Sequence, residues 1–208
     1  VLSMFVAMFA PRALNVALPL ARGEYLVIYD AEDEPEPGQV RAAAARFARA
    51  PGSVVCLQAR LAIENGGDGW LARLFTIEYA ALFDAVNPGL CALDFPVLLG
   101  GTSNHFRTRI LRDLHGWDAW NVTEDADLGL RLARAGYAVR DLPSTTWEEA
   151  PARLRPWLAQ RTRWMKGYLQ VWITHSREPR RVLAELGPLR AAAAVAGTLG
   201  TVIAALAY

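Results

Sequence analysis

The hydrophobic positions of this chain fall into short unbroken runs and helix-spaced stripes. Residues 25–29 form a run of β-branched and aromatic side chains without polar alternation, which predicts a strand buried on both faces. Residues 53–59 form a second such run, and the Ala- and Arg-rich stretch 39–50 between them predicts a helix. Because a strand, a helix and a strand in this order form a right-handed crossover, we expect an α/β fold with a mostly parallel sheet and flanking helices.

Further elements of the same domain follow from the same patterns. Helices are expected at residues 11–19, 70–86 (ended by Asn-Pro-Gly at 87–89), 109–114 and 123–136 (capped by Thr123), and strands from residue 97 into the Gly-Gly turn at 100–101 and over residues 137–142. Together these elements predict one α/β domain over residues 1–150.

The last quarter of the chain has a different character. Residues 151–173 predict an amphipathic helix with a cationic face and many Trp and Tyr side chains, which suits a membrane surface, although an ordinary helix packed on the sheet has the same spacing. Residues 189–208 are apolar apart from Arg190 and long enough to span a bilayer; an Ala-rich soluble helix is the alternative. We therefore expect an interface helix at 151–175 and a transmembrane helix at 188–208.

Composition excludes several other classes of protein. With 208 residues, 53% of them hydrophobic, and a net charge of +1, the chain can bury a sizeable core but lacks the basic excess of a nucleic-acid-binding protein. Its two cysteines, Cys56 and Cys91, are too few for a disulfide framework. Residues 1–10 are apolar without a charged segment before them, so we expect no signal peptide and a chain that starts within a longer protein.

A cluster of acidic side chains follows the first predicted strand. Asp30, Glu32 and Asp33 come directly after it, and Glu34 and Glu36 follow among prolines. Ligands of open α/β sheets bind beyond the carboxyl ends of strands, where carboxylates can hold a hard divalent cation and, through it, a diphosphate. Taken alone, the segment is equally well explained as an acidic, solvated turn.

Two further groups of polar residues occur downstream. Glu124 and Asp125 open a predicted helix, where the positive end of the helix dipole favours carboxylates. Gln160, Arg163 and Trp164 stand at positions i, i+3 and i+4, hence on one face of the interface helix. Alone, each group is explained by helix capping or by a solvated or membrane-facing surface.

In this order, the segments resemble the processive family 2 glycosyltransferases, the cellulose-synthase-like group. The resemblance covers about residues 11–173 and rests on Pro-Arg-Ala-Leu-Asn ending at Asn15, Tyr-Asp-Ala-Glu-Asp starting at Tyr29, Gly-Gly-Thr-Ser-Asn ending at Asn104, Thr-Glu-Asp ending at Asp125 and Gln-Arg-Thr-Arg-Trp ending at Trp164. It implies a GT-A-type, Rossmann-like fold that transfers a hexose from a nucleotide-diphosphate sugar, expected to be UDP-glucose, to a growing β-linked polysaccharide. It also implies an enzyme of the inner membrane whose catalytic domain faces the cytoplasm, in contact with the lipid bilayer, and it leaves room for accessory export subunits.

The resemblance implies roles for individual residues. Asp30 and Glu32 match the position that binds Mg²⁺ or Mn²⁺, with Asp33 as a substitute for the longer Glu32. Asp125 matches the catalytic base of an inverting displacement, while Glu124 shares its turn but points about 100° away. The expected residues for the donor diphosphate are Gln160, Arg163 and Asn15, and those for the acceptor are Trp164, Gly101, Thr102, Ser103 and Asn104.

Departures from the family pattern keep other functions open. The family places a lysine where this chain has Ala10, and its upstream nucleotide-contacting strand would lie before Val1. A catalytically silent membrane scaffold is therefore one alternative. A non-processive transferase that adds one sugar to a lipid carrier is another.

Overall fold

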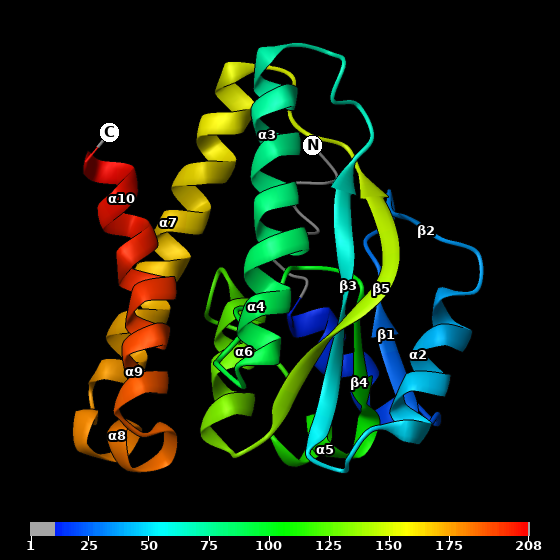
Figure 1. Ribbon diagram of the computed structural model, residues 1–208, viewed down its shortest axis with the longest axis vertical. Helices are drawn as coiled ribbons and strands as arrows, with labels where there is room; N and C mark the ends of the chain where they lie inside the picture. The colour runs from blue at the N-terminus through cyan, green and yellow to red at the C-terminus, as the bar shows by residue number, and fades with distance from the viewer. Residues whose placement is uncertain (1–10, 208) are drawn as a thin grey trace.

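A five-stranded mixed sheet forms the centre of the computed structural model, which describes residues 11–207 (Figure 1). The strands are β1 (Tyr25–Ile28), β2 (Glu34–Pro35), β3 (Val54–Ile63), β4 (Asn104–Arg107) and β5 (Ala138–Glu148), in the order β1-β4-β3-β5-β2. β3 and β5 pair in parallel, whereas β4 pairs antiparallel with both β1 and β3, and β2 pairs antiparallel with β5. The expected α/β fold is confirmed. The sheet is mixed rather than mostly parallel because β4 enters between β1 and β3 in the opposite direction.

The helices surround this sheet. They are α2 (Gln39–Arg49), α3 (Trp70–Ala80), α4 (Asn87–Ala92), α5 (Thr108–Asp113), α6 (Glu124–Arg134), α7 (Leu154–Ser176), α8 (Pro179–Leu186), α9 (Pro188–Val195) and α10 (Thr201–Ala207), with a 3₁₀ turn at Leu18–Leu20 after a helical stretch at 11–17. The expected break at 87–89 is wrong, because a π-helical segment (Ala81–Val86) carries the chain from α3 into α4. Pro88 is the second residue of α4, and because the helix is continuous here, its missing N–H leaves one carbonyl of the preceding turn without a helical hydrogen bond.

The expected strand at residue 97 is also absent from the described structure. Residues 95–100 have no regular secondary structure, although Val97 and Leu99 are buried in the core. The apolar run there reflects burial without strand pairing.

Layers of helix cover both faces of the sheet. Leu57 of β3 packs in one cluster with Phe47 of α2, whereas the preceding residue Cys56 packs in another cluster with Leu128 of α6. Neighbouring residues of a strand point to opposite faces, so β3 is buried on both sides, as its unbroken apolar run predicts.

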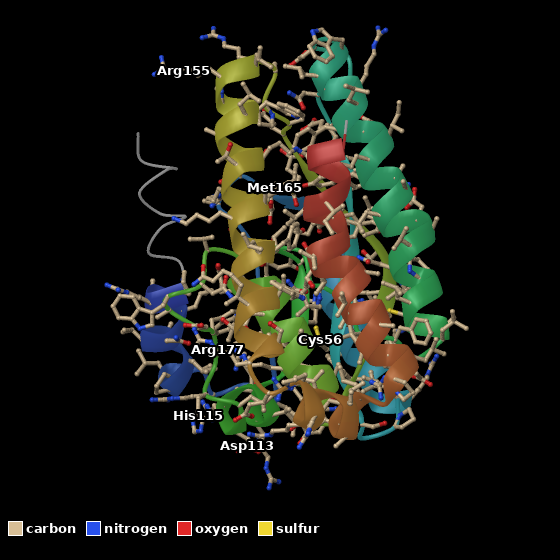
Figure 2. The ribbon with its side chains drawn as sticks, turned by 90° about the vertical axis from the view of Figure 1, so that its left-hand side faces the viewer. Cys56, Asp113, His115, Arg155, Met165 and Arg177 are labelled. Carbon is tan, nitrogen blue, oxygen red and sulfur yellow. The ribbon has the colours of Figure 1, made fainter. Side chains whose placement is uncertain are left out.

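The C-terminal helices form a separate layer beside the sheet. Figure 2 shows α7 running the height of the molecule, from Arg155 at one end to Arg177 at the other, with α9 and α10 returning alongside it. Among the described residues, Pro188–Ala205 is long and apolar enough to cross a membrane. The transmembrane assignment of this segment stays a prediction.

Candidate active site

The chain leaves β1 and folds at once into a closed acidic loop. The backbone N–H of Asp30 donates to Asp33 Oδ2 (2.7 Å) and to Thr102 Oγ1 (3.3 Å), and the Thr102 hydroxyl also donates to Asp33 Oδ2. The second oxygen of that carboxylate, Asp33 Oδ1, is buried and has no hydrogen-bond partner among the described residues. The loop therefore holds Asp33 in place with one oxygen left free.

A second pair of carboxylates stands at the start of α6. Glu124 and Asp125 occupy the first turn, and Asp125 Oδ1 accepts the Ala126 N–H at 2.7 Å. Thr123 occupies the N-cap position as expected, but its side chain makes no capping bond; the hydroxyl donates instead to Asn121 Oδ1 (3.4 Å). Because no side chain among the described residues caps α6, the positive N-terminal end of this helix faces the carboxylates of Glu124 and Asp125.

The folded chain brings these carboxylates together with Arg163 of α7. Loss of water around Asp30, followed by the charge of Asp33, raises the pKa of Asp30 to about 6, and Arg163 acts in the opposite direction. Burial raises the pKa of Asp125 to about 6 against the charge of Arg163, and Asp30 adds to the increase. Burial and then Asp125 raise the pKa of Glu124 to about 7. Because these groups alter one another's pKa, the end of β1, the start of α6 and the middle of α7 share one site.

The Gly-Gly turn borders this site. A Cβ atom on Gly101 would lie 3.5 Å from Asp125 Oδ2, so the glycine leaves space in front of that oxygen. Thr102, Ser103 and Asn104 are buried, with exposures of 2% or less. Hydrogen bonds within the protein occupy both hydroxyls and Asn104 Nδ2, whereas Asn104 Oδ1 has no partner among the described residues. Of the four residues of this segment expected to bind the acceptor, Gly101 is the exposed one.

The three predicted residues of α7 differ in their surroundings. Arg163 is exposed, and Gln160 is half-buried with an Oε1 atom that has no partner among the described residues. The Trp164 ring packs 6.0 Å from the Phe75 ring of α3 and lies 4.8 Å from the Arg161 guanidinium. Trp164 therefore contacts α3, and the acceptor-binding role of its ring stays a prediction.

The side chain of Asn15 contacts a loop rather than the carboxylates. Its Nδ2 donates to the Trp117 carbonyl (2.7 Å), and its Oδ1 accepts the Trp117 N–H (2.9 Å). Both polar atoms hold the loop that precedes α6, so the donor-binding role of Asn15 stays a prediction. Ala10, the position of the family lysine, lies outside the described residues.

Sequence patterns did not identify two polar residues beside the site. Glu148 ends β5 and accepts the Tyr79 hydroxyl at 3.3 Å; burial, then the charges of Asp33 and Asp30, raise the pKa of Glu148 to about 8. Gln58, buried in β3, accepts the Gly100 N–H at 2.8 Å and so holds the Gly-Gly turn. A single amide in an apolar strand was a usable signal for Gln58. No sequence signal pointed to Glu148, because only the folding of the chain brings it to the acidic loop.

The acidic loop fits a metal that is bound together with a phosphate ligand. No group of three His, Cys, Asp or Glu side chains that could hold a metal unaided occurs between residues 11 and 207. Asp30 and the free Oδ1 of Asp33 nevertheless suit Mg²⁺ or Mn²⁺, because such ions are often held by one or two carboxylates plus substrate phosphates and water. Glu32 is exposed, and its charge raises the pKa of Asp30 less than the charge of Asp33 does.

Comparisons with known proteins find several similar glycosyltransferases. The probable glycosyltransferase YdaM of Bacillus subtilis is 29% identical over 158 residues, covering 74% of this chain and 37% of its own length. The beta-monoglucosyldiacylglycerol synthase of Trichormus variabilis is 26% identical (77% and 35% covered), as is glucomannan 4-beta-mannosyltransferase 2 of Arabidopsis thaliana (69% and 27%). This chain thus spans between 27% and 37% of the length of these relatives.

A solved structure and a family model complete the comparison. The mannosyltransferase PcManGT from Pyrobaculum calidifontis, solved in complex with GDP-Man and Mn²⁺, superposes with a TM-score of 0.57 at 21% identity, covering 95% of this chain and 57% of the other. This likeness supports the GT-A-type fold. The model named Glycosyl transferase family group 2 matches residues 25–208. The chain therefore belongs to glycosyl transferase family group 2.

Proposed function

We propose that this chain forms the catalytic centre of a metal-dependent, inverting glycosyltransferase. It would move a hexose from a nucleotide-diphosphate sugar, expected to be UDP-glucose, onto a growing β-linked polysaccharide. The observation that carries the proposal is the convergence of Asp30, Asp125 and Arg163: the charge of Arg163 lowers the pKa of both carboxyl groups, and Asp30 raises the pKa of Asp125. Relatives named as polysaccharide synthases, including a poly-beta-1,6-N-acetyl-D-glucosamine synthase of Staphylococcus aureus, support the polymer product.

In this proposal Asp125 is the general base. The acceptor hydroxyl attacks the anomeric carbon of the donor, the bond to the nucleotide diphosphate breaks, and Asp125 takes the hydroxyl proton. A base works best with a pKa near the working pH, and burial has raised the pKa of Asp125 to about 6. Its Oδ2 borders the space beside Gly101, which is where we propose that the acceptor hydroxyl lies.

The leaving diphosphate would meet positive charge from two sides. Arg163 is exposed and can offer a two-pronged hydrogen bond to a phosphate. A divalent cation on Asp30 and Asp33 would neutralise the charge that develops on the diphosphate. The free Oδ1 of Asp33 supports that residue, rather than Glu32, as the second carboxylate ligand.

The membrane part of the proposal is supported by apolar side chains at the surface. Leu154 and Leu158 of α7 are about half exposed, and Leu189 and Ile203 of the candidate span are 67% and 55% exposed. We propose that α7 contacts the cytoplasmic face of the inner membrane, that the candidate span crosses the membrane, and that the polymer leaves through further parts of the protein or accessory subunits.

A second candidate function is the transfer of a single sugar to a lipid. It is favoured by the relative named beta-monoglucosyldiacylglycerol synthase. The size of the product separates the two functions: a polymer elutes early from a sizing column as high-mass material, whereas a glycolipid is extracted into organic solvent.

The test is sugar transfer by membranes that carry the full-length protein. Radiolabelled UDP-glucose, UDP-N-acetylglucosamine or GDP-mannose is supplied in separate reactions with Mg²⁺ or Mn²⁺, and incorporation is counted after product sizing. We expect incorporation that chelation abolishes and metal restores. The absence of transfer from all three donors would refute the proposal.

A matched pair of variants tests the metal site. Asp33→Asn and Glu32→Gln remove the same charge one residue apart, but only Asp33 is fixed by Thr102 and the Asp30 backbone. We expect Asp33→Asn to raise the metal concentration needed for half-maximal activity at least tenfold and Glu32→Gln to change it little. The reverse order would return the metal site to Asp30 and Glu32.

A further inference from the structure

One face of α7 is buried against the body of the protein. The buried residues of this helix are Gly167, Val171 and His175, which stand four apart and therefore lie in one stripe. Arg163 occupies the preceding position of the same stripe, next to the candidate active site. Whatever holds the stripe against α6 also sets where Arg163 lies.

Gly167 allows α7 to approach the start of α6 closely. A Cβ atom at this position would lie 2.8 Å from Thr123 Cβ and closer still to Thr123 Cγ2. Any larger residue would push α7 away from the residue that directly precedes Glu124 and Asp125. The backbone of α7 therefore packs on the Thr123 side chain at the active-site end of the stripe.

His175 makes the second contact of the stripe with α6. Its Nε2 lies 2.9 Å from Asp127 Oδ1, and its Nδ1 lies 2.8 Å from Arg134 Nη1. Since a guanidinium can only donate, Nδ1 accepts, and the proton of the neutral ring is on Nε2, which donates to Asp127. Burial alone would raise the pKa of Asp127, but the His175 hydrogen bond and the Arg131 charge outweigh it and lower the pKa.

The same network ties α6 to its other neighbours. Arg131 donates to the carbonyls of Leu114 (2.8 Å) and Gly116 (2.6 Å) in the loop after α5. Arg134 Nε donates to Glu185 Oε2 of α8 at 2.6 Å. Hydrogen bonds of Arg131 and Arg134 thus fix α6 on the α5 and α8 sides, and hydrogen bonds to His175 fix it on the α7 side.

We propose that His175 is a positioning residue for glycosyl transfer, which sets the placement of Arg163 relative to Asp125 by locking α7 onto α6. The proposal rests on the proposed function of that site. His175 follows Arg163 by twelve residues, about 18 Å along the helix, and acts through the packing of α7 rather than on the substrate.

The test compares three substitutions at this position. His175→Leu leaves Asp127 Oδ1 and Arg134 Nη1 without their hydrogen bonds to His175, His175→Gln retains one donor and one acceptor, and His175→Asn retains them on a shorter arm. At a temperature where each variant is folded by circular dichroism, we expect kcat/KM for the donor to fall roughly 10- to 100-fold in the Leu and Asn variants. His175→Gln should recover most of that loss. Equal activity of the Gln and Asn variants would overturn the proposal, even if the Leu variant does not fold.

A double-mutant cycle separates positioning from general stability. If His175 acts through Arg163, adding Arg163→Lys to His175→Asn should cost little beyond the His175→Asn loss, because the Arg163 interaction is already impaired. If His175 only stabilises the fold, the two losses in kcat/KM should multiply, which would overturn the proposal.

Arg107 offers a matched control elsewhere in the fold. Its side chain donates to the carbonyls of Val54 (3.0 Å) and Phe47 (2.9 Å), tying β4 to α2 at the end of β1 opposite the acidic loop. Arg107→Leu should lower the unfolding temperature and leave kcat and KM unchanged in folded protein. A loss of kcat as large as that of His175→Asn would count against a specific role for His175.

A readout independent of activity distinguishes this proposal from the proposed function. The ¹⁵N spectrum of the histidine side chains should show the His175 ring neutral with its proton on Nε2, identified by its loss in His175→Gln. A protonated Nδ1 would overturn the proposed contact whether or not the protein transfers sugar. The expected tautomer in a protein that transfers no sugar would refute the proposed function and leave the helix contact standing.

Discussion

Replacing Asp125 by Asn tests the proposed base with little change of shape. The variant keeps an Oδ1 that can accept the Ala126 N–H, now at 2.7 Å, but it loses the negative charge and the basicity. A positioned general base contributes roughly 10²–10⁴-fold to a rate, so kcat for sugar transfer should fall by about that factor.

The pH dependence of this loss follows from the raised pKa. Burial raises the pKa of Asp125 to about 6, so well below that pH the base is protonated and the wild type loses its rate advantage over Asp125→Asn. Asp30 and Glu124 titrate nearby, which is why the ratio of wild type to variant is the useful quantity. The ratio should be constant above about pH 7 and shrink about tenfold per pH unit below pH 6.

The same pKa predicts an opposite effect on stability. In the unfolded chain Asp125 has a pKa near 3.8, so ionised Asp125 lowers the free energy of unfolding. This destabilisation grows between about pH 4 and pH 6 and is complete above about pH 6. Two pKa units correspond to at most about 3 kcal/mol, less for a partly exposed group coupled to other carboxylates. Asp125→Asn should therefore unfold several degrees higher than wild type at pH 7 without donor, and at the same temperature at pH 4.

Sugar transfer and the unfolding temperature are measured for each variant. Radiolabelled transfer is followed in membranes with matched amounts of wild type, Asp125→Asn and the control Asp113→Asn, an exposed carboxylate at the opposite end of the molecule from Arg155 (Figure 2). The purified proteins are then unfolded by heat. Activity within threefold of wild type at pH 7.5 would refute the base assignment. Loss of activity accompanied by a lower unfolding temperature would indicate damage to the fold instead.

Three further substitutions have defined outcomes. Arg163→Lys keeps the charge but loses the two-pronged hydrogen bond, so donor kcat/KM should fall about tenfold, with a matching loss of nucleotide affinity by calorimetry. Glu148 has a pKa raised from 4.5 to about 8 by burial, so Glu148→Gln should gain stability over wild type in urea unfolding as pH rises from 5 to 8; a constant difference would contradict this. Gly167→Ala should lower the free energy of unfolding by about 1–3 kcal/mol in calorimetry, and Thr123→Ala in the same chain should recover part of it.

Local patterns were sufficient for several elements of this fold. The stretch 39–50 predicts a helix, and α2 covers Gln39–Arg49; the stretch 123–136 predicts another, and α6 covers Glu124–Arg134. Gly136 stands just past α6 with a φ of 82°, a left-handed conformation in which glycine is favoured. Such features depend on residues a few positions apart, which is why they can be recognised without a structure.

The sequence by itself also identified three charged residues of the candidate site. Asp30, Asp125 and Arg163 come from three separate segments, and their order along the chain carried the resemblance to the family. What the order could not determine was how the sheet closes around them. β4 pairs antiparallel between β1 and β3, a choice made by contacts between residues about fifty to eighty positions apart.

Only the tertiary structure decided which side chains surround those residues. Asp33 rather than Glu32 is fixed beside Asp30 because Thr102, far along the chain, donates to it. Glu148 and His175 matter to the site because β5 ends beside the acidic loop and α7 packs on α6. Periodicity describes how one segment presents its own faces, whereas these contacts depend on which faces meet, and that is determined by the packing of the whole chain.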